Sequence, residues 1–270
     1  MRKPKPFTPP AGTNEGHFVG PVDLTHWQTA AGQELVHQHR RLTERFGPQG
    51  ALIVSLTVGG LIAVGATFAT TRIYDSVLGR RGIASLDEPA LNLAKKLRSP
   101  IVNGAAAGIA RLFGPIAMPI LSIGAAAALA AHQRRRTPAI IMVAAGLGSL
   151  AMTITGKDII HRHRPPRSDA IPPYETSPSF PSGHTLNATT ILGALSYLMV
   201  TTQTRRRTQT LTITSAAATA VTVGLSRVLL GAHWLTDVAV GWVSGTGWLA
   251  LIITSHRLYL TTRHTGTNPQ

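Results

Sequence analysis

Residues 138–156 read PAIIMVAAGLGSLAMTITG, an apolar run of membrane-spanning length that contains no charged side chain. A helix needs about 20 such residues to cross the roughly 30 Å hydrocarbon core of a bilayer, because each residue advances it by about 1.5 Å. Residues 157–166 follow directly and read KDIIHRHRPP, in which basic side chains predominate. The sequence therefore predicts a membrane helix with a cluster of basic residues just beyond one end.

Five further segments have the length and composition of membrane spans. The stretch Ile101–Ala131 is too long for one upright span, so we divide it into an amphipathic interfacial helix and a span from Gly114, with a kink near Pro119. Another short surface helix is expected within Ser76–Ser99. The fold class is therefore all-α, an integral membrane six-helix bundle with an interfacial helix in the first outer loop. The predicted spans are Gly50–Thr70, Gly114–Ala131, Pro138–Gly156, Thr185–Thr202, Leu211–Leu225 and Asp237–Ser255.

Composition narrows the functional classes. Charged residues make up only 14% of the 270 residues, which is low for a soluble domain, and the absence of cysteine excludes disulfides, thiolate zinc sites and cysteine nucleophiles. A net charge of +15 could suit nucleic acid, an anionic membrane surface or a phosphorylated substrate. Because the basic residues are divided between the two sides of a membrane, they form no continuous basic face, and nucleic acid is not an expected partner.

The short basic loops orient the bundle. Arg134–Arg136 and Arg205–Arg207 lie in short loops without acids, so the positive-inside rule makes both loops cytoplasmic. Counting spans then places the loop after Gly156 and the loop around His233 together on the opposite face. We therefore expect a multi-pass plasma-membrane protein with an extracytoplasmic active site and cytoplasmic termini. Its expected parts are a flexible basic cytoplasmic tail (1–49), a six-span membrane domain (50–256) and a cytoplasmic C-terminal tail (257–270).

Three short motifs lie at this outer face, in the two loops just named and at the ends of the spans beside them. The first is Lys157, six residues, then Arg164-Pro165; the second is Pro181-Ser182-Gly183-His184; the third is Ser226-Arg227, five residues, His233, three residues, and Asp237. In order, spacing and membrane context they resemble the three-part signature of the type 2 phosphatidic acid phosphatase family, over about Gly50–His256.

The third motif contains the candidate nucleophile. His233 and Asp237 are four residues apart, so on a helix they lie on one face, where the carboxylate can accept the imidazole Nδ1 proton. The Nε2 atom is then available to attack phosphorus and form a phosphohistidine. The family resemblance implies the same roles for both residues.

The other motif residues suit phosphate binding and proton transfer. His184 is the candidate general acid, and Ser182 and Gly183 precede it at the start of a span, where backbone amides favour an anion. Single basic residues near a membrane are more often snorkelling anchors, but here they recur together at family spacings. The candidate phosphate-binding cations are Lys157, Arg164 and Arg227, and with three of them no metal or other cofactor is expected.

The resemblance implies a lipid phosphatase, with a membrane-anchored lipid phosphate as substrate. Family members act on phosphatidic acid, phosphatidylglycerol phosphate and polyprenyl diphosphates, and the motifs do not distinguish these lipids. The Ala-, Thr- and Arg-rich composition is typical of a bacterium with GC-rich codons. This origin favours undecaprenyl diphosphate, the polyprenyl carrier of cell-wall synthesis. Two alternatives stay open. Vanadium haloperoxidases share the three-part motif but are soluble, and a membrane transporter or scaffold could keep the fold without catalysis. The sequence leaves the oligomeric state open.

Overall fold

The structure of the protein, a computed structural model, describes residues 18–19, 22–77 and 83–265. Within this part of the chain the fold is helical, and a single antiparallel pair of two-residue strands is the only β structure. The prediction of an all-α membrane fold is confirmed. The elements are β1 (Phe18–Val19), β2 (Val22–Asp23), α1 (Ala30–Val77), η2 (Ile83–Leu86), α2 (Asp87–Lys96), α3 (Pro100–Leu112), α4 (Ala117–Gln133), α5 (Thr137–Ile160), η3 (Arg167–Asp169), α6 (Gly183–Val200), α7 (Arg206–Leu229) and α8 (Leu235–Thr265).

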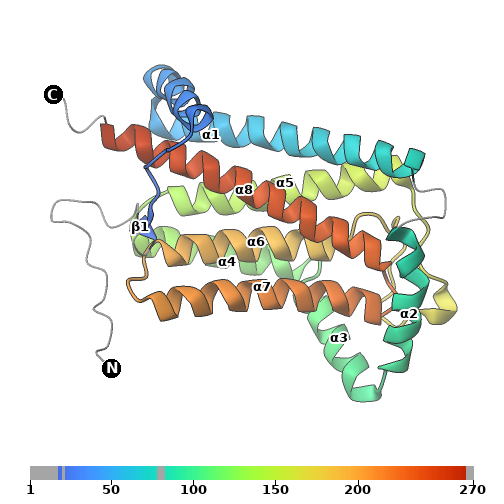
Figure 1. Ribbon diagram of the computed structural model, residues 1–270. Helices are drawn as coiled ribbons and strands as arrows, with labels where there is room; N and C mark the ends of the chain where they lie inside the picture. The colour runs from blue at the N-terminus through green and yellow to red at the C-terminus, as the bar shows by residue number, and fades with distance from the viewer. Residues whose placement is uncertain (1–17, 20–21, 78–82, 266–270) are drawn as a thin grey trace.

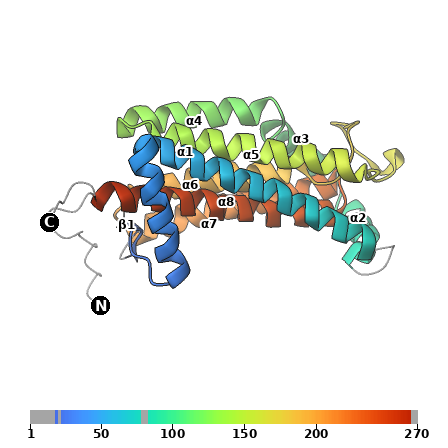
Figure 2. The same cartoon turned by 90° about the horizontal axis from the view of Figure 1, so that it is seen from above.

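The long helices run side by side, with α6 packed between α5, α7 and α8 (Figures 1 and 2). Helices α2 and α3 lie at one end of this bundle, near the loops that follow α5 and α7 (Figure 1). The strand β1 and the last described turn of α8 lie at the other end. The loops that carry Arg134–Arg136 and Arg205–Arg207 are also at that other end, because each joins two neighbouring antiparallel helices there. The two kinds of loop are therefore separated by the full length of the bundle.

The helices differ in how well they suit a membrane. Four are long and apolar enough to cross one: the Ala30–Gly65 part of α1, α5, α7 and α8. The bent pair α3 and α4 could supply a fifth span. Helix α6 has 18 residues and does not meet the same criteria, although it lies inside the bundle. A helix that is surrounded by other helices exposes little surface to lipid, so it can span a membrane with fewer apolar side chains. The count of six spans stays a prediction.

The predicted kink lies earlier than Pro119. Helices α3 and α4 meet at 55° across residues 113–116, a break that contains Gly114 and Pro115. Pro119 instead occupies the first turn of α4, where the missing backbone N–H disturbs no intrahelical hydrogen bond. The chain thus turns before the span begins, and this turn places α3 across the end of the bundle.

The N-terminal region contains more helix than the expected tail. Helix α1 begins at Ala30, and Gly47 kinks it in the left-handed region (φ 71°), so its first part crosses the bundle (Figure 2). Trp27 donates from Nε1 to the Thr261 hydroxyl at 3.0 Å, which ties this region to α8. The boundary at residue 49 therefore falls inside a helix. The three-part division stays a prediction, and residues 1–17 and 266–270 of the tails lie outside the described residues.

Close packing of α6 on α8 fixes the two helix starts beside each other. A Cβ atom at Gly241 would lie 2.9 Å from Thr185 Cβ, and one at Gly245 would lie 2.9 Å from Thr189 Cβ. These glycines allow the helices to approach. At the end of the contact, the backbone N–H of Ser182 donates to the Asp237 carbonyl at 3.1 Å. The second and third motifs are thereby joined through the backbone.

Candidate active site

The candidate nucleophile lies at the start of α8, almost fully buried. His233 Nε2 faces Arg164 Nη1 at 3.1 Å, and His233 Nδ1 faces Asp237 Oδ2 at 3.5 Å. Because a guanidinium can only donate, the Nε2 atom must accept, so the neutral ring carries its proton on Nδ1. This tautomer leaves a lone pair on Nε2 and directs the proton toward the carboxylate, as the spacing of the two residues predicts.

The Asp237 carboxylate is fixed by more than the histidine. Its Oδ2 atom accepts from the Trp234 backbone N–H at 2.9 Å, half of a capping box at the first turn of α8. Its Oδ1 atom accepts from Arg162 Nη1 at 2.5 Å. Arg162 also donates from Nη2 to Asp87 at 2.6 Å, and Asp87 in turn accepts the backbone N–H of Thr236 at 2.9 Å. One arginine thus links two buried carboxylates, from α2 and α8, at the start of the helix that presents the nucleophile.

His184 lies in the first turn of α6, and its ring contacts helix α3. Its Nε2 atom lies 3.2 Å from the carbonyl oxygen of Ala110 in α3. A carbonyl can only accept, so Nε2 carries a proton and Nδ1 is the atom directed toward the site. His184 Nδ1 lies 3.6 Å from a carboxylate oxygen of Glu175. Helix α3 therefore orients the ring of the candidate general acid.

A carboxylate occupies the centre of the cation cluster. Glu175, in the loop between α5 and α6, contacts Arg227 through Oε1 and Arg164 through Oε2, the latter at 2.8 Å. The same group lies 3.7 Å from His233 Nε2 and 3.6 Å from His184 Nδ1. It therefore stands between the two candidate catalytic histidines and against two of the predicted phosphate-binding arginines.

Glu175 keeps its charge in this position. Burial by itself raises the pKa of the Glu175 carboxyl, but its contact with His233 and the positive charge of Arg227 outweigh burial and hold that pKa well below its usual range. Glu175 is therefore ionised across the neutral pH range. If the arginines bind phosphate as predicted, that phosphate has to displace the Glu175 carboxylate, since protonation does not neutralise it.

The three predicted phosphate-binding cations have different surroundings. Arg227 is fully buried in α7, and its Nε and Nη1 atoms have no hydrogen-bond partner among the described residues, so two donors await an acceptor. Arg164 also donates from Nη1 to the Ala232 carbonyl at 2.6 Å. Lys157 contacts neither histidine directly; its Nζ donates to Ser177 Oγ at 2.9 Å and to the Pro178 carbonyl. Lys157 thus holds the loop that carries Glu175.

The remaining motif residues line the start of α6. Ser182 Oγ accepts from Thr185 Oγ1 at 2.9 Å, which leaves its own proton for another acceptor. Gly183 is the first residue of α6, and a Cβ atom there would lie 2.9 Å from Thr153 Cγ2 on α5, so glycine permits the close approach. Ser226 is different, since its hydroxyl donates back to the Val223 carbonyl at 2.7 Å, a bond within its own helix.

Sequence reasoning missed Arg162, Asp87 and Glu175. Arg162 does not match the three-part motif, and its partner Asp87 lies 75 residues away. Glu175 had a weak signal that could have been used, since it is the one acid between Asp169 and the second motif in a strongly basic outer segment. Only the folded chain shows that the acid faces the phosphate-binding arginines.

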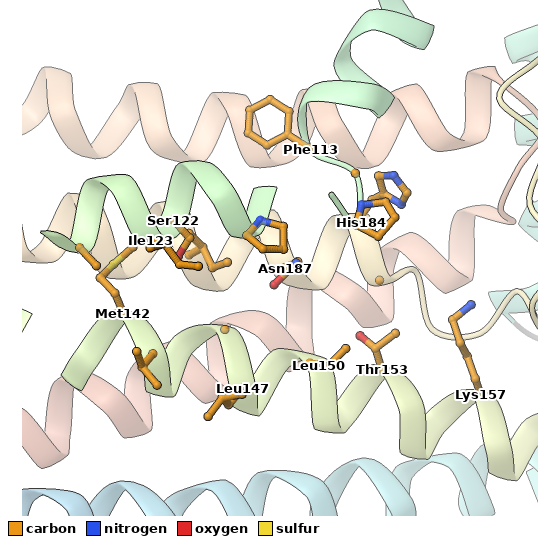
Figure 3. Close-up of a pocket in the computed structure, with 18 of the residues that line it drawn as sticks. Phe113, Ser122, Ile123, Met142, Leu147, Leu150, Thr153, Lys157, His184 and Asn187 are labelled. Atoms are coloured by element: carbon orange, nitrogen blue, oxygen red, sulfur yellow. The ribbon is translucent and has the colours of Figure 1, made fainter. Parts of the chain in front are cut away.

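An apolar groove opens from this cluster. It has a volume of about 710 Å³ and runs between α4, α5 and α6. Its polar end contains Lys157, Glu175 and His184, and Figure 3 shows Leu150, Leu147 and Met142 following Lys157 along α5. On the other side Ser122 and Ile123 of α4 face the same space (Figure 3). The site is therefore continuous with a channel suited to a hydrocarbon chain.

Replacing Glu175 with glutamine is expected to strengthen inhibition by inorganic vanadate or phosphate. The amide keeps the size of the side chain but loses the charge that competes for Arg164 and Arg227, so the inhibition constant should fall about tenfold, the factor that corresponds to one weakened charged hydrogen bond. Inhibition of phosphate release by vanadate measures the effect. The control is Glu88→Gln, an exposed acid on α2. Equal inhibition constants for the wild type and Glu175→Gln would contradict the displacement of Glu175.

Comparisons with known proteins agree with this geometry. The model of the PAP2 superfamily matches residues 137–259, which include all three motifs. Phosphatidylglycerophosphatase B of Bacillus subtilis (strain 168) is 28% identical over 174 residues, 64% of this chain and 84% of that protein. The crystal structure of a transmembrane PAP2-type phosphatidylglycerolphosphate phosphatase from Bacillus subtilis superposes with a TM-score of 0.62 at 26% identity, covering 70% of this chain and 93% of that one. The three comparisons therefore support the resemblance to the type 2 phosphatidic acid phosphatase family that the three motifs indicate.

Proposed function

We propose that the protein is a membrane lipid phosphatase that removes the terminal phosphate of a glycerophospholipid through a phosphohistidine at His233. The observation that carries the proposal is the continuity of the apolar groove with the cation cluster, since Lys157 and His184 line both. A lipid can then keep its chain among apolar side chains while its phosphate reaches the histidines. The relatives named as phosphatidylglycerophosphatases support phosphatidylglycerol phosphate as the first substrate to test.

The proposed reaction has two steps. His233 Nε2 forms a bond to phosphorus as the bond from phosphorus to the lipid oxygen breaks, and His184 gives that oxygen a proton. In the second step His184 takes a proton from water, the water oxygen bonds to phosphorus, and the bond between phosphorus and His233 breaks to release inorganic phosphate. Asp237 stabilises the positive ring that exists between the steps.

The anion is held by the cluster around Glu175. Arg227 and Arg164 are proposed to bind the phosphate oxygens in place of that carboxylate, and the buried, unpartnered Nε and Nη1 atoms of Arg227 within the described residues support this. Ser182 and the Gly183 backbone amide are proposed as further donors at the start of α6. Lys157 adds positive charge at the mouth of the groove. With these cations in place, no metal is assigned a role.

A polyprenyl diphosphate, such as undecaprenyl diphosphate, is the second candidate. The far part of the groove, beyond Ser122, is lined only by apolar groups such as Ala126, Ala139 and Met142, which suits a long hydrocarbon chain. A panel of lipids decides between the candidates. Purified protein in a chelator should release phosphate fastest from phosphatidylglycerol phosphate, compared with phosphatidic acid and polyprenyl mono- and diphosphate. Fastest release from polyprenyl diphosphate would favour the second candidate, and no release from any member of the panel would overturn the proposal.

We further propose that the active site faces outward and that the arginine-rich loops face the cytoplasm of a plasma-membrane protein. The cysteine-free chain allows a direct test. A cysteine in place of the exposed Ser168, beside the site, should react with an impermeant thiol reagent in intact cells. Thr204→Cys, in the exposed loop at the opposite end, should react only after the membrane is permeabilised. The reverse pattern would invert the topology.

A further inference from the structure

One polar side chain in the groove has no part in the phosphate chemistry. Asn187 lines the groove on α6, three residues after His184, so the two side chains lie on one helix face with Cβ atoms about 5–6 Å apart. Figure 3 places Asn187 between the α4 side chains Ser122 and Ile123 and the position of His184, facing the space in front of α5. Asn187 thus lies about one helical turn further along the groove than His184.

The amide of Asn187 is held in place from one side. Ser149 on α5 donates from Oγ to Asn187 Oδ1 at 2.6 Å, and Ser149 is itself buried. This bond uses Oδ1, so the Nδ2 atom takes no part in it, and the Asn187 side chain lines the groove. An amide donor beside an apolar channel is costly unless it meets an acceptor. The arrangement therefore presents an oriented donor to whatever fills the groove.

The position of this donor along the groove determines which lipids can accept a hydrogen bond from it. In a glycerophospholipid the carbon that carries the phosphate is followed by a carbon with an oxygen, either a free hydroxyl or an acyl ester. In an alkyl or polyprenyl monophosphate, the corresponding carbon carries no oxygen. Leu150 and Leu147 line the same groove on α5 and offer no hydrogen bond. Asn187 is the side-chain amide on this part of the wall, and its donor can distinguish glycerophospholipids from alkyl and polyprenyl monophosphates.

We propose that Asn187, oriented by Ser149, is a subsite that binds an oxygen of the glycerol backbone and so favours glycerophospholipids over alkyl or polyprenyl phosphates. The proposal rests on the proposed lipid phosphatase function. It assigns Asn187 a part in binding and in specificity, because its side chain lies beyond the atoms that react. The effect should appear as a difference between substrates and not as a general loss of activity.

The experiment compares two single-chain lipids that differ in the glycerol unit: oleoyl lysophosphatidate and oleyl monophosphate. For Asn187→Leu, kcat/KM for phosphate release should fall about tenfold on lysophosphatidate, the factor for one lost hydrogen bond, and less than about twofold on oleyl phosphate. Ser149→Ala should give a smaller loss with the same selectivity, because the amide remains but is no longer oriented. Leu150→Ala is the matched control in the groove and should change both substrates by the same factor.

Equal losses on the two lipids in Asn187→Leu overturn the subsite. If Asn187→Leu does not fold, Ser149→Ala decides alone: a loss confined to lysophosphatidate supports the subsite, and equal or absent losses overturn it. Failure of the underlying function has a different signature, since the wild type would then release phosphate from neither lipid. That result would overturn both proposals.

Discussion

Replacing His233 with alanine is expected to reduce phosphate release to the background of the assay. The side chain supplies the atom that bonds to phosphorus, so no other group in the cluster can replace it. The variant should still fold, because Asp237 keeps its hydrogen bonds to Arg162 and to the Trp234 backbone N–H. Release of inorganic phosphate from a lipid phosphate, measured with purified protein in detergent, gives the result.

The residual turnover of His233→Ala should be compared with that of His184→Ala. A general acid and base contributes typically about 10²–10⁴-fold, so His184→Ala should retain measurable turnover where His233→Ala does not. The loss of the first step in His184→Ala, relative to the wild type, should be smaller with an aryl phosphate, whose leaving group needs little help from an acid. A His233→Ala variant with full activity would show that the nucleophile has been misassigned.

Replacing Arg162 with alanine should have the second large effect, on both stability and turnover. Arg162 links Asp237 and Asp87, which are both buried, at 2.5 and 2.6 Å. Removing one partner of a buried ion pair costs about 3–5 kcal/mol, because the remaining charge is left without compensation. A lysine cannot make two divergent hydrogen bonds in the same geometry, so Arg162→Lys should also be impaired. Thermal unfolding and kcat, measured on the same preparations, report the two effects.

A second substitution separates stability from positioning. In the double variant Arg162→Ala with Asp87→Asn, one uncompensated charge is removed, so part of the unfolding free energy should return. Turnover should stay low, because Asp237 still lacks the guanidinium that fixes its Oδ1 atom. Recovery of kcat in parallel with stability would mean that Arg162 acts only on the fold.

The sequence alone predicts the membrane-helical fold and the motif positions because both depend on local patterns. Apolar length predicts a span, and the four-residue spacing of His233 and Asp237 predicts a shared helix face. The structure brings the two side chains together, but His233 lies two residues before α8 begins, so the pair stands at a helix start and not on one helix face. The turn before α4 was predicted too late because Pro119 was taken as a kink, whereas proline is tolerated in the first turn of a helix. Helix α6 covers the predicted span Thr185–Thr202 but does not meet the criteria of length and apolarity that α5, α7 and α8 meet, so the number of spans stays a prediction.

The contacts that complete the site depend on residues that are distant in the sequence. Arg162 reaches Asp237 across 75 residues, and Glu175 meets Arg227 across 52. No spacing rule links such pairs, because their proximity follows from the packing of α2, α7 and α8 against the loop between α5 and α6. The same holds for Asn187, because its proposed binding role depends on the groove that α4 and α5 form beside it.

The most direct test of the account is to locate phosphate on the protein during turnover. His184→Ala, given an aryl phosphate, should form the covalent intermediate but hydrolyse it slowly, since the base that activates water is missing. After rapid quenching, mass spectrometry of peptides should find an acid-labile, alkali-stable phosphate on His233, and none in the His233→Ala variant. Phosphate on another residue, or turnover with no covalent phosphate at all, would contradict the account.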